Sequence, residues 1–235
     1  MRLDSLSSTE FKRIMEGRPI VFLPIGGTEA HSSHLPLCTD SVQPEFVADA
    51  VAERVDGLVA PPLRYAFHSS TRNMPGTLTL GFETTIRVVY DILMSLISNG
   101  ADKLVVISGH AGSSHMNALR QACVEVVEET GVRLMLLTDY DLVKQFPEDQ
   151  KGDGHGGKME TARMMDIAPE LVRPQDKVGR YVSQGYMILS DPERSMPDGF
   201  VGDAPSATAE LGRRLNSFIV DELTKEIKAT FGVEE

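Results

Sequence analysis

Short apolar runs alternate with longer amphipathic stretches along the whole chain. This alternation is typical of a mainly parallel sheet with helices on both faces, so we predict an α/β fold of three layers (αβα), forming a single domain over residues 1–235. Continuous apolar runs predict strands over residues 19–25, 57–60, 103–107 and 132–137. Apolar residues at helical spacing predict helices over residues 41–55, 82–98, 114–129, 158–167 and 206–231. We expect loops over residues 61–73 and 174–205.

Composition narrows the class of protein. The hydrophobic fraction of 41% and the charged fraction of 24% are those of an ordinary globular protein. A net charge of −11 repels a phosphate backbone, so we expect no nucleic-acid partner. No apolar run reaches the roughly 18 to 20 residues that a membrane span requires, and the first residues are too polar for a secretory signal. We therefore expect a cytoplasmic protein without a membrane partner, in which Cys38 and Cys123 are reduced.

Two short glycine-containing segments follow predicted strands and hold four of the six histidines. In open α/β sheets the carboxyl ends of the strands form the ligand crevice, so His31 and His110 should be neighbours in space. Around His31, the residues Glu29 and Asp40 are also metal-ligand types. Glu29 and His31 could each bind one of two adjacent cations, with Asp40 bridging both. The alternative makes Asp40 a helix cap and leaves His31 and His34 as loop-packing residues.

The segment 108–112 lies between a strand and a helix, where glycines let the backbone approach a ligand. His110 is the natural further metal ligand there. The alternative is an anion nest, because backbone N–H groups at a helix start bind phosphate by themselves. His115 lies inside the predicted helix, where a packing or surface role is expected.

A third segment, residues 153–161, places one histidine in a glycine-rich loop and one carboxylate in the first turn of a helix. Glu160 could favour the helix start simply through the helix dipole. His155 has no apolar stripe to join, and we expect a catalytic role for it. Carboxylates about 4 Å apart repel by roughly 4 kcal/mol at an effective dielectric near 20, so the group needs cations. Oxygen and nitrogen ligands without thiolate suit zinc, manganese or ferrous iron.

These segments together resemble the creatininase family of metal-dependent amidohydrolases. The resemblance covers nearly the whole chain and is carried by five segments, namely Gly26–Asp40, Met74–Thr77, Gly109–Gly112, His155–Thr161 and Gly199–Gly212. It implies two divalent metal ions, one held by Glu29, Asp40 and His110 and the other by His31 and Asp40. Creatinine-hydrolysing members complete the second ion with a glutamate where this chain has Gly112. We expect Glu160 to replace that glutamate.

The family resemblance also implies a reaction. A hydroxide held between the two cations would attack the carbonyl carbon of an amide, cyclic amide or formamide, and His155 would deliver a proton to the leaving nitrogen. Creatinine itself is a less expected substrate, because creatinine-specific relatives look to be lined by tryptophan and this chain has none.

A second branch of the family suggests the substrate. It includes an archaeal formamide hydrolase that acts on a ribosylaminopyrimidine phosphate of riboflavin and F420 synthesis. Our first expectation is therefore a formamidopyrimidine ribosyl phosphate, with Arg64, Arg72 and Ser113 as residues that could meet its phosphate.

Two further expectations complete the analysis. The resemblance suggests a closed homo-oligomer, often a hexamer. The rival hypothesis for function is a non-catalytic module that uses residues 108–112 and 152–157 to bind a nucleotide or sugar phosphate without metal.

Overall fold

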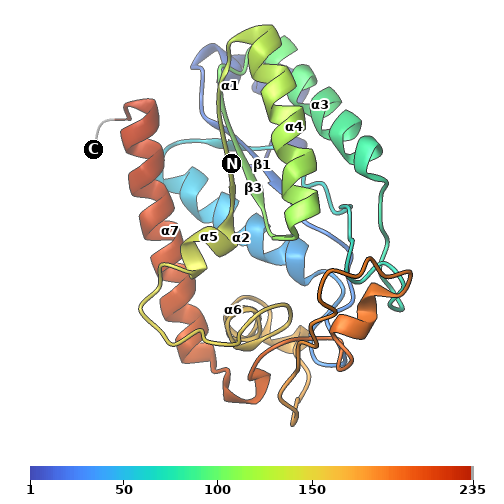
Figure 1. Ribbon diagram of the computed structural model, residues 1–235. Helices are drawn as coiled ribbons and strands as arrows, with labels where there is room; N and C mark the ends of the chain where they lie inside the picture. Colours follow the sequence, from blue (N-terminus) through green and yellow to red (C-terminus); the bar gives the residue numbers. More distant parts are fainter. Residues whose placement is uncertain (234–235) are drawn as a thin grey trace.

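A four-stranded parallel sheet forms the centre of the molecule (Figure 1), and the computed structural model describes residues 1–233 of the chain. The strand order is β2-β1-β3-β4. The strands are β1 (Val21–Ile25), β2 (Leu58–Val59), β3 (Lys103–Ser108) and β4 (Arg133–Thr138), and every neighbouring pair is parallel. The mainly parallel sheet predicted from the alternating pattern is therefore confirmed.

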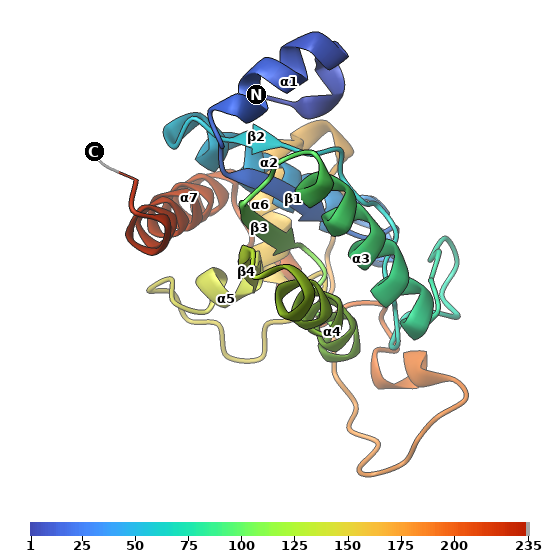
Figure 2. The same ribbon diagram turned by 90° about the horizontal axis from the view of Figure 1, so that it is seen from above.

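Helices cover both faces of this sheet (Figure 2), as the predicted αβα arrangement requires. One face packs against α2 (Thr39–Arg54), α5 (Asp139–Val143), α6 (Lys158–Ile167) and α7 (Ala209–Phe231). The other packs against α1 (Ser8–Glu16), α3 (Phe82–Ser98) and α4 (Ser113–Thr130). Short 3-10 helices complete the chain at η1 (Leu3–Ser5), η2 (Pro169–Leu171), η3 (Pro192–Ser195) and η4 (Ala204–Ser206).

The strand sequences explain how one sheet supports two cores. Successive side chains of a strand point to opposite faces. In β1, Val21, Leu23 and Ile25 join the core on the α3 and α4 side, and Phe22 joins the core on the α2 and α7 side. All five residues of β1 are buried, which accounts for the continuous apolar run seen in the sequence.

Several boundaries differ from the sequence expectation. The helices predicted over residues 82–98 and 158–167 have those bounds in the structure. Helix α2 begins two residues before the predicted start, and α7 begins three residues after it. The sequence analysis missed α1, although Ser7 and Glu10 form a capping box at its start. It also missed α5, a helix of only five residues.

The ends of the strands position the loops that follow them. Ile25 of β1 pairs with Ser108 of β3, and Ser108 pairs with Thr138 of β4. The segments after these strands therefore leave the sheet at one common edge. Among residues 1–233, no helix has the length and apolar character needed to span a bilayer.

Candidate metal centre

Close backbone packing brings three chain segments to the carboxyl edge of the sheet. A side chain at Gly109, directly after β3, would overlap the backbone carbonyl oxygen of Asp40. Only glycine allows the end of β3 to approach the first turn of α2 so closely. Asp40 is thereby placed between the loop after β1 and the loop after β3.

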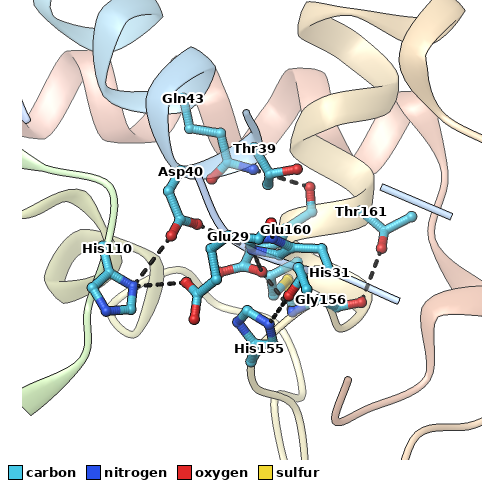
Figure 3. A network of polar contacts seen from close by, with 12 residues as sticks. Glu29, His31, Thr39, Asp40, Gln43, His110, His155, Gly156, Glu160 and Thr161 are labelled. Atoms are coloured by element: carbon cyan, nitrogen blue, oxygen red, sulfur yellow. Dashed lines mark hydrogen bonds and ion pairs between the residues drawn. The ribbon is translucent and has the colours of Figure 1, made fainter. Parts of the chain in front are cut away.

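Asp40 contacts histidines from both loops (Figure 3). Its Oδ1 atom lies 3.1 Å from Nε2 of His31, and its Oδ2 atom lies 3.2 Å from Nδ1 of His110. The Asp40 side chain is 3% exposed, and Asp40 lies inside the first turn of α2, whose N-cap residue is Cys38. The geometry thus disagrees with the alternative in which Asp40 only caps the helix.

Glu29 lies on the His110 side of Asp40. Its Oε2 atom is 2.9 Å from Nδ1 of His110, and its Oε1 atom accepts a hydrogen bond from the Thr71 hydroxyl. The backbone N–H of Glu29 donates to the Leu37 carbonyl, which folds the loop after β1 back on itself. The carboxylate is therefore held in one orientation and is 2% exposed.

His31 and Glu160 lie on the other side of Asp40. Nδ1 of His31 is 3.0 Å from the backbone carbonyl of Glu29 and donates its proton to it, so Nε2 is the nitrogen on which a proton or a cation can be held. Nε2 faces Asp40 and lies 3.6 Å from Oε2 of Glu160. That oxygen also accepts a hydrogen bond from the Gly156 backbone N–H at 2.6 Å. The Glu160 carboxylate thus accepts a backbone hydrogen bond just before α6 and also faces His31.

His155 completes the group and contacts His31. The two rings lie 4.2 Å apart between centroids, and Nε2 of His155 donates to the Ala30 carbonyl at 2.8 Å. This hydrogen bond leaves Nδ1 of His155 as the unprotonated nitrogen of the neutral ring. The structure therefore brings together all six residues that the sequence predicted, Glu29, His31, Asp40, His110, His155 and Glu160.

The cluster attracts positive charge. Burial acts to lower the pKa of His31, but the facing Asp40 carboxylate outweighs burial and raises that pKa to about 10. Burial raises the pKa of Glu160 to about 7. Burial also acts to raise the pKa of Glu29, yet His110 and His155 hold it well below its ordinary value. Burial lowers the pKa of His155, with a contribution from the charge of His31, so this imidazole is neutral at neutral pH.

The donor atoms fit divalent cations. Oε2 of Glu29, Oδ2 of Asp40 and Nε2 of His31 are buried and have no hydrogen-bond partner among the described residues. Buried polar atoms without partners are costly, and here they converge on common points. Three overlapping groups have donor atoms within 4.8 Å of one another. They are formed by Glu29, Asp40, His68 and His110, by His31, Asp40 and Glu160, and by Glu29, His31 and His155.

Residue His68 was not assigned a role by the sequence analysis. It lies in the loop that follows β2, which also ends at the carboxyl edge of the sheet. Its position after a strand could have identified His68 as a candidate site residue, because His31 and His110 were selected for the same reason. Its orientation toward Glu29 depends on the path of a long loop, which residue spacing does not reveal.

The other histidines have structural surroundings. His34 is fully buried, and its Nε2 atom contacts the Gly156 carbonyl at 2.9 Å, which ties the loop after β1 to the start of α6. His115 is fully buried against His110, so the packing role expected for it agrees with its position. Cys38 belongs to none of the three groups of donor atoms.

One cavity is lined by the cluster, and a second cavity lies beside it. A chamber of about 220 Å³ is lined by Glu29, Asp40, His110, His155 and Glu160, with Ser70, Tyr140 and Met196 among its further walls. A second cavity of about 610 Å³ shares Met196 with it and extends along Ala30, Asn73 and Glu193.

The two arginines expected near a substrate phosphate have other partners. Arg64 forms a two-point ion pair with Glu45 on α2 at 2.9 Å. Arg72 donates to the backbone carbonyls of Ser69, Leu189 and Ser190. The expectation that they are free to bind phosphate is therefore not supported, because tertiary contacts invisible in the sequence engage both guanidinium groups.

A three-layer parallel fold with buried carboxylates and imidazoles at its carboxyl edge defines a hydrolase-type metal centre. Comparison with known proteins identifies the family. Residues 4–227 match the creatininase family, described as creatinine amidohydrolase, and the chain belongs to that family. It is a metal-dependent amidohydrolase, as the resemblance in the sequence implied.

Individual relatives differ in what they act on. The chain is 28% identical to a creatinine amidohydrolase of Pseudomonas putida, covering 93% of this chain and 92% of the relative. It is 29% identical to a mycofactocin precursor peptide peptidase of Mycobacterium ulcerans, covering 96% and 91%.

Solved structures support the use of divalent metal. A mutant creatininase of Zn–Zn type aligns with a TM-score of 0.87 at 25% identity, covering 97% of both chains. A structure described as creatininase Mn aligns with a TM-score of 0.85 at 26% identity, again covering 97% of both.

Proposed function

We propose that this chain hydrolyses a non-peptide C–N bond of an amide, cyclic amide or formamide at a site for two divalent cations. The observation that carries the proposal is the position of Asp40, whose two oxygens face histidines from two different loops. A carboxylate shared in this way suits a pair of adjacent cations better than one cation.

The proposed ligand sets follow from the contacts. Glu29, Asp40 and His110 would hold one cation, and His31, Asp40 and Glu160 the other. When bound, such cations polarise a carbonyl oxygen and lower the pKa of water to about 7, which supplies the nucleophile at neutral pH. Zinc, manganese and ferrous iron all suit these nitrogen and oxygen donors.

His155 is the proposed proton carrier. It lines the chamber, and its hydrogen bond to Ala30 leaves Nδ1 free to accept a proton. The lowered pKa keeps the ring neutral and therefore able to accept, after which Nδ1 would donate the proton to the leaving nitrogen. Position 112, beside His110, is a glycine and carries no carboxylate. A Cβ there would lie 2.6 Å from Nε2 of His110, so any side chain at this position would displace the imidazole.

The proposed substrate class is a formamide on a ribosylaminopyrimidine phosphate, with creatinine as the less expected substrate. The chamber of about 220 Å³ has room for the reacting amide, and the rest of such a substrate would extend into the adjoining cavity. The absence of tryptophan removes the flat indole walls expected around creatinine.

A peptide amide is the second candidate substrate. The observation favouring it is the neighbouring cavity of about 610 Å³, which is larger than the chamber and shares the wall residue Met196 with it. The mycofactocin precursor peptidases among the relatives act on a peptide, in agreement with a longer substrate.

One screen tests these proposals together. Metal-stripped protein would be reconstituted anaerobically with zinc, manganese or ferrous iron and given formamides with and without a phosphate, lactams including creatinine, and short peptides. Metal-dependent release of formate supports the formamide proposal, and release of amino acids supports the peptide candidate. Retained binding of a nucleotide or sugar phosphate by stripped protein, without any hydrolysis, would favour the metal-free binding module instead.

Assembly and location complete the proposal. By the family resemblance we propose a homo-oligomer, with a hexamer as the leading state, located in the cytoplasm. Light scattering coupled to size-exclusion chromatography tests the hexamer directly, because it compares the mass of the assembly with the chain mass of 25.7 kDa.

A further inference from the structure

We infer that His68 is a fourth protein ligand of the cation proposed to lie between Glu29, Asp40 and His110. The inference rests on the proposed two-cation site and assigns to this chain a ligand that the sequence analysis did not identify. It makes the two cation sites unequal in their number of protein donors.

The distances around His68 are those of a coordination shell. Nδ1 of His68 lies 3.3 Å from Oε2 of Glu29. Nδ1 of His110 lies 2.9 Å from the same oxygen and 3.2 Å from Oδ2 of Asp40. A tetrahedral site with bonds of about 2.1 Å has donor atoms about 3.4 Å apart. The donor atoms of all four residues lie within 4.8 Å of one another.

The contact between Nδ1 of His68 and Oε2 of Glu29 is close, at 3.3 Å, but is not aligned as a hydrogen bond. Within residues 1–233, neither ring nitrogen of His68 has a hydrogen-bond partner, and Oε2 of Glu29 has none. The His68 side chain is 0% exposed, so bulk solvent does not reach its ring nitrogens. Buried polar atoms without partners are uncommon in folded proteins. A cation shared by Nδ1 of His68 and Oε2 of Glu29 would give these two atoms a common partner.

The loop after β2 holds the His68 ring in this position. The backbone N–H of His68 donates to the Thr79 hydroxyl at 2.9 Å. The other side of the ring packs on Gly27, where a Cβ would lie 2.5 Å from Cε1 of His68. The ring edge that carries Nδ1 is left facing the carboxylate. His68 is therefore oriented before any ligand binds, which lowers the entropic cost of binding.

The fourth ligand separates the roles of the two cations. The site with His68 has four protein donors and resembles the closed arrangement of a structural zinc site. The site formed by His31, Asp40 and Glu160 has three, which leaves a position open for water or substrate. The first cation should therefore bind tightly, and the second should exchange more readily.

The decisive measurement counts imidazoles on the wild-type protein. Metal-stripped protein would be loaded with one equivalent of Zn²⁺ and studied by X-ray absorption. Two coordinated imidazoles, from His68 and His110, are expected. One coordinated imidazole would overturn the inference.

A matched pair of variants gives a second readout. His68→Gln should weaken the tighter of the two Zn²⁺ sites by at least about 10- to 100-fold in competition with a chelator. His115→Gln should leave both affinities unchanged, because His115 is equally buried beside His110 but faces no carboxylate. Thermal unfolding of the stripped variants checks their folding.

The outcomes separate this inference from the proposed function. Wild-type protein that binds no Zn²⁺ tightly would refute the two-cation site itself. Wild-type protein that binds two Zn²⁺, with the tight site unaffected in a folded His68→Gln variant, would refute only the role of His68.

Discussion

The ion pair between Arg163 and Asp139 offers a quantitative test of how the centre is supported. Arg163 lies on α6, three residues after Glu160, and Asp139 follows β4 directly. Their side chains are 0% and 1% exposed and meet at 2.8 Å. Nε of Arg163 also donates to Asn216 on α7 at 3.0 Å. The pair therefore fixes α6 against the sheet edge.

Replacing Asp139 by Asn keeps the shape of the side chain and removes its charge. The buried Arg163 guanidinium would lose its counter-ion, which costs about 3–5 kcal/mol of unfolding free energy. At about 2–4 °C per kcal/mol for a chain of this size, the melting temperature should fall by about 6–20 °C. Because α6 carries Glu160, the variant should also bind its second cation more weakly.

Denaturant unfolding of metal-stripped protein measures this cost, with an unchanged m-value as the sign that both states are otherwise the same. Burial raises the pKa of Asp139 more than Arg163 lowers it, so desolvation offsets the attraction. The double variant Asp139→Asn with Arg163→Met should therefore recover much of the lost stability. A loss of unfolding free energy below about 1 kcal/mol in Asp139→Asn would contradict this prediction, because it would show that the buried Arg163 charge costs little without its counter-ion.

Four further outcomes are expected. Glu160→Gln should reduce bound metal from two ions to one per chain, and unchanged stoichiometry by elemental analysis would contradict its role as a ligand. His155→Ala should lower turnover by about 10²- to 10⁴-fold with metal content unchanged, and normal turnover would remove its role as proton carrier. Burial raises the pKa of the Cys123 thiol to about 12, so iodoacetamide at pH 8 should modify the half-exposed Cys38 first, as mass spectrometry can check. The pKa of His31 is raised from 6.5 to about 10, so protonation stabilises the metal-free fold below pH 6.5 and this stabilisation is lost as pH rises toward 10. Metal affinity should rise over the same window because the cation replaces that proton, and calorimetry in buffers of different ionisation enthalpy would show proton release.

The sequence predicted the layers of the fold because apolar periodicity reports burial directly. The strand β3 and the helix over 82–98 illustrate this, since their apolar residues mark both the element and its buried face. Helix α1 was missed because it is short and buries only Met15 fully, so its polar residues dominate the pattern. Helix α5 is too short for periodicity to be recognised.

The candidate site was predictable for a topological reason. His31 and His110 lie in loops that follow strands, and Asp40 begins a helix at the same edge, so parallel topology gathers these three. His155 and Glu160 do not directly follow a strand, and the family resemblance indicated that Glu160 belongs to the same site. Contacts made by long loops were not predictable in this way. The ring of His68 and the pairing of Arg64 with Glu45 depend on loop paths that no local pattern encodes.

Arg72 connects the two segments that border the chamber. It extends from the loop that contributes Ser70 to the chamber wall and donates to the carbonyls of Leu189 and Ser190, in the segment that contributes Met196. The guanidinium of Arg72 thus ties together two segments of the chamber wall, although Arg72 does not itself line the chamber. Asn73 donates to Ser190 as well, so substitutions at these two positions would loosen the border of the chamber while leaving the metal ligands in place.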